Sequence, residues 1–65
     1  MSERETLQRE VDAHAARVAE ITSALQNGDD SDEMWDARAR LLRMELIGRT
    51  AAIEIGSSRL RYLRD

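Results

Sequence analysis

Residues 33–65, EMWDARARLLRMELIGRTAAIEIGSSRLRYLRD, decide the fold of this protein. The stretch contains no proline and is typical of one helix of about nine turns. Apolar residues cover most of its circumference, whereas a surface helix of a globular protein usually has one apolar stripe somewhat over ~100° wide. We therefore expect this helix to lie at the centre of its assembly.

Two apolar stripes run along this predicted helix. One is centred on Leu41 and consists of Met34, Ala37, Leu41, Met44, Gly48, Ala51, Ala52, Ile55, Tyr62 and Leu63. The other lies about 100–140° away and consists of Trp35, Leu42, Leu46, Ile53 and Leu60. A clearly polar face is left only at Asp36, Arg43, Thr50, Glu54 and Arg61. One partner helix cannot cover both stripes, so we expect the chain to self-associate.

An earlier helix is predicted over about residues 2–27. Ser2 followed by Glu5 forms a capping box at its start. Its apolar side follows a heptad pattern through Leu7, Val11, His14, Val18, Ile21 and Leu25. Gly28 after Asn27 ends the helix, because glycine takes the left-handed conformation that a helix C-terminus commonly requires. This helix therefore has one narrow apolar face.

A short turn, residues 28–30, connects this helix to the second, which is predicted over about 31–63. Asp30 and Glu33 form another capping box there. Helices joined by a short turn pack antiparallel, so residues 1–65 are predicted to form one all-α domain, an antiparallel two-helix hairpin. A chain of 65 residues buries a small core and has no cysteine for a disulfide. We therefore expect the hairpin to dimerise into a four-helix bundle.

Three small residues, Gly48, Ala52 and Gly56, lie four residues apart on one ridge of the second helix. Either Gly56 and the two following serines break the helix, or the small side chains let another helix approach closely. We favour close packing, with a crossing between two copies, because the apolar stripes continue in register past Gly56. Leu41→Asp or Ile55→Asp is then expected to abolish both helicity and dimerisation. The expected dimer interface consists of Trp35, Leu42, Leu46, Gly48, Ala52, Ile53, Gly56 and Leu60.

The end of the second helix is a candidate site for another protein. We expect the second helix to exceed the first by roughly seven residues, about 10 Å, which would leave this end uncovered. The cover is then either a second copy of the chain or another protein that docks by the helix-in-groove mode. The expected partner-binding residues are Arg59, Leu60, Arg61, Tyr62, Leu63 and Arg64.

Charge is divided unevenly along the chain. Residues 1–36 carry three arginines and ten acids, a net charge of −7, and residues 37–65 carry seven arginines and three acids, a net charge of +4. Acids at helix starts and arginines at the end of the second helix are the placement that helix dipoles favour. A nucleic-acid-binding surface is the alternative. It would consist of Arg40, Arg43, Arg61 and Arg64.

Few residues indicate chemistry. His14 is the only histidine and lies in the heptad of the first helix, so we interpret it as a packed residue and expect no metal, cofactor or catalytic site. Arg38, Arg49 and Arg59 fall within the apolar arc of the second helix. We expect them to extend along the first helix toward its acids; an anion site in the bundle core is the alternative. Glu45 and Arg49, four residues apart, are expected to pair.

The chain has no apolar run as long as a signal-peptide core or a membrane span, so we expect a cytoplasmic protein that does not enter a membrane. All ten basic residues are arginine. Such usage is typical of GC-rich genomes and indicates a bacterium or its phage as the source.

Two resemblances bear on function. The run RTAAIEIGSSR, residues 49–59, resembles the end of the first helix of the all-helical chorismate mutases, in which Arg59 would match a basic active-site position. Gly48 stands where that family has a catalytic arginine, and Ser31 stands where another is expected. The hairpin with its acidic turn is similar to the Rop family of plasmid RNA modulators, which dimerise into a four-helix bundle and bind RNA hairpins.

The patterns together favour a non-enzymatic protein–protein interaction module, a small adaptor or regulator that acts as a homodimer. A nucleic-acid-binding regulator of the Rop type is the alternative, and a helical enzyme similar to chorismate mutase is a distant one. The exposed face of the first helix is acidic, which disfavours the binding of RNA loops there.

Overall fold

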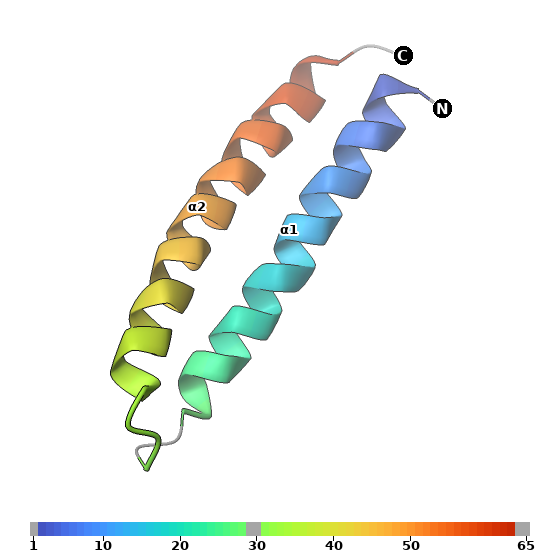
Figure 1. The fold of residues 1–65 in the computed structure, drawn as a ribbon. Coiled ribbons are helices and arrows are strands. Elements are labelled where there is room, and N and C mark those ends of the chain that lie inside the picture. The colour runs from blue at the N-terminus through green and yellow to red at the C-terminus, as the bar shows by residue number, and fades with distance from the viewer. Residues whose placement is uncertain (1, 29–30, 64–65) are drawn as a thin grey trace.

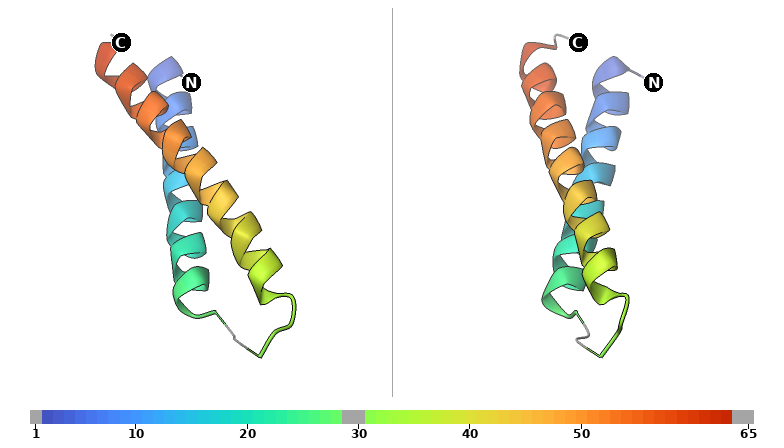
Figure 2. Two further views of the ribbon diagram at one scale, coloured as in Figure 1. Left: turned by 90° about the vertical axis from the view of Figure 1, so that its left-hand side faces the viewer. Right: turned by 60° about the vertical axis from the view of Figure 1, so that its left-hand side comes forward.

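The protein is a hairpin of two α-helices. The computed structural model describes residues 2–28 and 31–63, with helices α1 (Glu3–Gln26) and α2 (Trp35–Tyr62). The helices pack antiparallel, with the start of α1 and the end of α2 together at one end of the molecule (Figure 1). They cross at a shallow angle, which the rotated views show (Figure 2). The predicted all-α two-helix hairpin is therefore confirmed for the described residues.

Helix α1 begins where its capping residue predicts. The Ser2 hydroxyl accepts a hydrogen bond from the Glu5 N–H at 3.1 Å, which satisfies one of the free amides of the first turn. The helix ends with Asn27, whose N–H donates to the Ser23 carbonyl at 3.0 Å. Among the described residues no glycine has a positive φ, so the left-handed conformation predicted for Gly28 is wrong. Glycine is needed there for space, because a Cβ would collide with the Trp35 indole.

The connection is longer than the predicted turn, because α2 begins at Trp35 rather than near residue 31. Asp32 organises the last part of this loop. Its carboxylate accepts a hydrogen bond from the Met34 N–H at 2.9 Å, and its carbonyl accepts one from the Trp35 N–H at 2.9 Å. Asp30, which belongs to the second predicted capping box, lies outside the described residues.

Each helix turns one heptad line of residues toward the other, and we call these two lines the inner seam. On α1 the buried and half-buried members are Arg4, Leu7, Val11, His14, Val18, Ile21 and Leu25. On α2 they are Trp35, Ala39, Leu42, Leu46, Arg49, Ile53, Gly56, Leu60 and Leu63. The heptad predicted for the first helix thus lies against α2. The core is small. Among its large side chains Ile21 is fully buried, and the others keep some exposed surface.

Helix α2 continues through Gly56 without a break. Gly56 is buried, and a Cβ at this position would lie 2.5 Å from Val11 Cγ2 and 3.8 Å from Leu7 Cδ1. Close packing at this glycine was expected, but the neighbour is α1 of the same molecule and not a second copy of α2. The predicted crossing between copies at this point is corrected accordingly.

Candidate interaction surface

A second line of mostly apolar residues lies on the outer side of α2. It is spaced by three and four residues and consists of Met34, Ala37, Leu41, Met44, Gly48, Ala51, Ile55, Ser58 and Tyr62, which we call the outer seam. On a regular helix the centres of the two seams are about 145° apart. The large apolar side chains that are exposed, between 61% and 83%, are five members of this seam and Ile47 beside it. The described part of α1 has none, so α2 alone presents an uncovered apolar face.

The structure divides the residues predicted for the dimer interface between the two faces of α2. Gly48 is in the outer seam and exposed, and no atom lies within 4 Å of the position that a Cβ would occupy there. Ala52 is half-buried at the side of the hairpin. The remaining six, which belong to the inner seam, are Trp35, Leu42, Leu46, Ile53, Gly56 and Leu60. Because α1 covers these six, the surface open to a second copy is the stripe that contains Leu41.

Helix α1 reaches the end of α2, contrary to the expectation of an uncovered tip. Arg4 Nη2 donates to the carbonyl oxygens of Leu60 at 3.2 Å and of Leu63 at 2.6 Å. Leu60 belongs to the last turn of α2 and Leu63 is its C-cap, so these are carbonyls that lack a partner within the helix. The later start of α2 reduces its surplus length from the expected seven residues to four, since α1 has 24 residues and α2 has 28. Sequence reasoning missed Arg4, although it stands three residues before Leu7 in the heptad.

The predicted partner-binding residues at this tip differ in exposure. Leu60 and Leu63 are half-buried beside α1, whereas Tyr62 and Arg61 are exposed. The Arg59 guanidinium lies 3.8 Å from the Glu3 carboxylate. Arg64 lies outside the described residues. Tyr62, the last member of the outer seam, is therefore the apolar part of the tip that is open to a partner.

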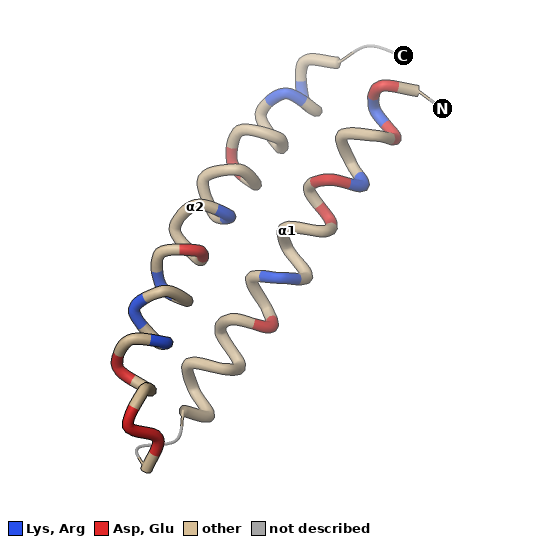
Figure 3. The backbone as a smooth tube through the Cα atoms, in the orientation of Figure 1, with Lys and Arg blue, Asp and Glu red and all other residues tan. Residues whose placement is uncertain are grey.

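A cluster of charged side chains joins the middle of the two helices. Arg17 donates two hydrogen bonds to the Glu45 carboxylate, from Nε at 2.7 Å and from Nη2 at 3.0 Å. Arg49 Nε donates to the same carboxylate at 2.8 Å, which confirms the predicted pair of Glu45 and Arg49. Arg49 Nη1 also lies 3.1 Å from His14 Nδ1. Figure 3 shows basic and acidic positions on both helices in this part of the hairpin.

The ion pair between Arg17 and Glu45 shifts the pKa values of both groups. The bidentate bond from Arg17, supported by Arg49, lowers the pKa of Glu45 to about 2, although partial desolvation opposes the shift. The same bond raises the pKa of Arg17 above its ordinary value. A guanidinium group can only donate, so in this contact Arg49 is the donor and His14 Nδ1 the acceptor. The cluster thus ties α1 to α2 in the middle of the hairpin.

The three arginines predicted to extend along the first helix behave differently. Arg49 and Arg59 reach α1, through His14 and Glu3. Arg38 instead pairs with Asp32 in the loop, with 3.3 Å between Nη1 and Oδ2. The expected contact with an acid of α1 is therefore found for Arg59, whereas Arg49 reaches α1 at His14 and pairs with Glu45 of its own helix.

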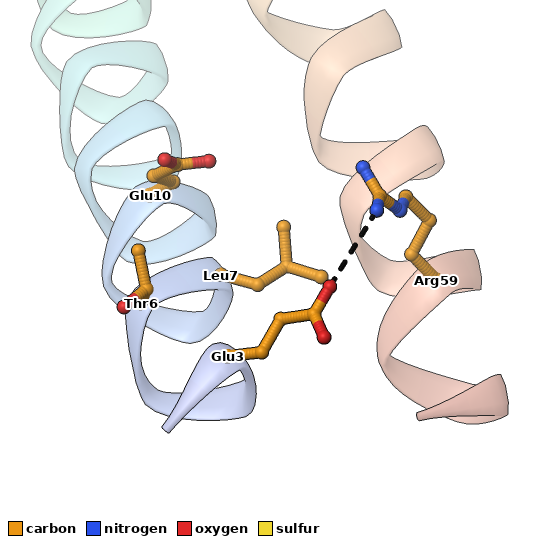
Figure 4. Close-up of a pocket in the computed structure, with 5 residues that line it drawn as sticks. All are labelled: Glu3, Thr6, Leu7, Glu10 and Arg59. Carbon is orange, nitrogen blue, oxygen red and sulfur yellow. Dashed lines mark ion pairs between the residues drawn. The ribbon is translucent and has the colours of Figure 1, made fainter. Parts of the chain in front are cut away.

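An open groove runs between the first half of α1 and the last part of α2. Its wider portion has a volume of about 460 Å³ and is lined by Glu3, Thr6, Leu7, Glu10 and Arg59. In Figure 4, Glu3 points across the groove toward Arg59. A smaller hollow of about 250 Å³ continues past Ala52, Gly56 and Ile55. The small residues of α2 leave this space, and Ile55 makes it continuous with the outer seam.

The arginines of the predicted nucleic-acid surface share their side of α2 with acids. Arg40, Arg43 and Arg61 are exposed, and so are Asp36 and Glu54 on the same helix. The tube in Figure 3 shows basic and acidic positions mixed along α2. Arg64, the fourth predicted residue, lies outside the described part of the chain.

Within residues 2–28 and 31–63, no three histidine, cysteine or carboxylate side chains come together as metal ligands. In the same part of the chain, neither helix is apolar enough over a sufficient length to span a bilayer. Comparisons with protein families, with curated proteins and with solved structures found no match to this chain. The function is therefore argued from the surface of the hairpin itself.

Proposed function

We propose that the protein is a non-enzymatic protein–protein interaction module, an adaptor or regulator that acts as a homodimer through the outer seam of α2. The observation that carries this proposal is the set of large apolar side chains, 61–83% exposed, that lie on one side of one helix. Monomeric proteins rarely expose contiguous apolar patches of this kind, and such patches mark interaction sites. Heptad spacing is the pattern by which helices bind other helices.

The small core supports the same proposal. Among the described apolar residues, those that are buried are Val11, Ile21 and Ala39. Burial of one large aliphatic side chain contributes about 1.5–3 kcal/mol, and short chains with small cores usually need an additional source of stability. The chain has no cysteine for a disulfide. Covering the outer seam with another helix would bury Leu41, Met44 and Ile55, which the hairpin leaves exposed.

The tip extends the same surface toward a further partner. Tyr62 continues the outer seam to the end of α2 and is 83% exposed. Arg61 beside it is exposed as well. An adaptor that dimerises along α2 would keep these two side chains at the edge of the dimer, where a second protein could contact them.

Sedimentation of three forms tests the dimer. The wild type is expected to be a dimer at micromolar concentration, and Leu41→Asp is expected to be a monomer, because dimerisation would bury an unpaired charge. Thr50→Asp, an exposed residue of the same helix outside both seams, is the matched control and should remain a dimer. In the hairpin Leu41 is 66% exposed, so any loss of helicity should follow from loss of the dimer. A monomeric wild type, or a dimeric Leu41→Asp variant, would overturn the proposal.

A further inference from the structure

The order of large and small residues in the outer seam distinguishes between the possible arrangements of two α2 helices. When two such helices pack in parallel, each residue faces its own copy. Leu41 would then meet Leu41, and Gly48 would meet Gly48. Layers with two large side chains would then alternate with layers that two small side chains leave nearly empty. Such cavities are costly, because protein interiors pack densely.

An antiparallel arrangement matches the large residues of the seam other than Tyr62 with small ones. With the two-fold axis near Leu46, the heptad geometry places Leu41 opposite Ala51 of the second copy and Met44 opposite Gly48. The same register places Ile55 opposite Ala37. Each of these pairs occurs twice in a symmetric dimer. The seam is thus self-complementary in size over most of α2.

Charges beside the seam favour the same register. Arg40 and Glu54 both stand one position before a seam residue, on the flank that also contains Ile47. In the antiparallel register Arg40 lies level with Glu54 of the second copy, and Ile47 lies beside its own copy. Within residues 2–28 and 31–63, neither Arg40 nor Glu54 has an ion pair in the hairpin, and both are exposed.

A shift by one heptad removes this match. When the shift moves the two-fold axis toward the end of α2, Arg40 comes level with Arg61 of the second copy, so that like charges face each other. Gly48 then lies opposite Ala51 of the second copy, and this layer of the seam is nearly empty. A like-charged pair is destabilising by about as much as an opposite pair stabilises. The size pattern and the charge pattern therefore agree on one register.

We infer that the occupant of the outer seam is a second copy of this chain, bound antiparallel with the two-fold axis near Leu46 and with Arg40 of each copy beside Glu54 of the other. The inference rests on the proposed function and adds its geometry. Because the two seams of α2 lie about 145° apart, the four helices form a row in the order α1, α2, α2, α1. The assembly is a flat layer rather than a square bundle.

A charge exchange tests the orientation. Arg40→Glu and Glu54→Arg are each expected to raise the dimer dissociation constant about tenfold at low salt, because each replaces two attractive pairs by two repulsive ones. The double variant restores opposite charges and is expected to dimerise nearly as well as the wild type. In a parallel dimer Arg40 would instead lie beside Glu45, and Glu54 beside Arg59, so the double variant would be weaker than either single variant.

The outcomes separate the two proposals. Dimeric wild type with a restored double variant supports the antiparallel register. Dimeric wild type with an impaired double variant overturns the register but leaves the interaction module standing. A wild type that is monomeric at micromolar concentration overturns both.

Cysteine cross-linking provides a second measurement, because the natural chain has no cysteine. Leu41→Cys and Ala51→Cys, mixed and oxidised, are expected to form a disulfide-linked heterodimer. Neither variant alone should cross-link, because two copies of position 41 would lie about 15 Å apart along the helix axis. Efficient self-linking of either variant would instead show a parallel dimer.

Discussion

Helices α1 and α2 share one seam but differ completely on their other faces. All large apolar residues of the described part of α1 lie in the inner seam, and its outer face is charged or alanine-rich. Helix α2 has the inner seam and, on the opposite side, the outer seam. One seam is enough to hold a helix against its neighbour in the chain. The second seam of α2 is therefore the feature that requires explanation by function.

The largest expected effect is on the seam that both helices share. Ile21 has no exposed surface, so Ile21→Asp would bury an unpaired carboxylate at a cost of several kcal/mol, about as much as the whole stability of a small domain. Circular dichroism should show loss of the helices. Ala19→Asp, on the exposed face of α1, is the control and should change stability by less than about 1 kcal/mol. Retained helicity in Ile21→Asp would contradict the assignment of the core.

The two glycines of α2 should respond with opposite signs. Gly56→Ala places a methyl group 2.5 Å from Val11 Cγ2, and the crowding should outweigh the gain in helix propensity, for a net loss of up to about 2 kcal/mol. Gly48→Ala meets no atom within 4 Å in the hairpin and should gain up to about 1 kcal/mol. Urea denaturation measures both.

Protein concentration sharpens this contrast. In the proposed antiparallel dimer Gly48 faces Met44, so the gain from Gly48→Ala should shrink as the concentration rises and the dimer forms. If Gly48→Ala stabilised the protein equally at all concentrations, this would mean that no helix of a second copy packs against Gly48. A stabilising Gly56→Ala would mean that α1 does not approach α2 as closely as the structure shows.

The smallest effect concerns the charged cluster between the helices. The pKa of Glu45 in the folded protein is about 2, below its ordinary value of 4.5, so the cluster stabilises the fold above pH 4.5 and that stability is lost as the pH falls toward 2. Glu45→Gln should therefore melt below the wild type at neutral pH, and the difference should disappear in acid. The melting temperatures are compared at one protein concentration, because dimerisation also shifts them.

Glu10→Gln is the control for this prediction. Glu10 is exposed and has no ion pair among the described residues. Its replacement should leave the melting temperature nearly unchanged across the same pH range. A difference between Glu45→Gln and the wild type that grows in acid would contradict the assigned direction of the pKa shift.

The sequence was sufficient to predict what depends on short-range patterns. Ser2 and the heptad from Leu7 to Leu25 predicted α1 almost to the residue, and the spacing of Glu45 and Arg49 predicted their pair. Helix periodicity also predicted that α2 has two apolar stripes. These features depend on residues within one or two turns of each other, so the sequence contains them directly.

What could not be predicted depends on how one helix is rotated against the other. Both stripes of α2 were apolar, and the choice of Trp35, Leu42 and Leu46 to face α1 is made by packing across the hairpin. The bond of Arg17 to Glu45 joins residues 28 positions apart, and Arg4 caps carbonyls still farther along the chain. Such contacts follow from register, which the longer loop and the later start of α2 determine.

The side chain of Arg4 gives the hairpin a second closure. The loop holds the helices together at one end covalently, and at the other end Arg4 binds the last carbonyls of α2. Fraying, which normally begins at helix ends, is therefore opposed at the end of the hairpin away from the loop. Amide hydrogen exchange in the last turn of α2 should be slower than its terminal position would suggest, and Arg4→Ala should accelerate it.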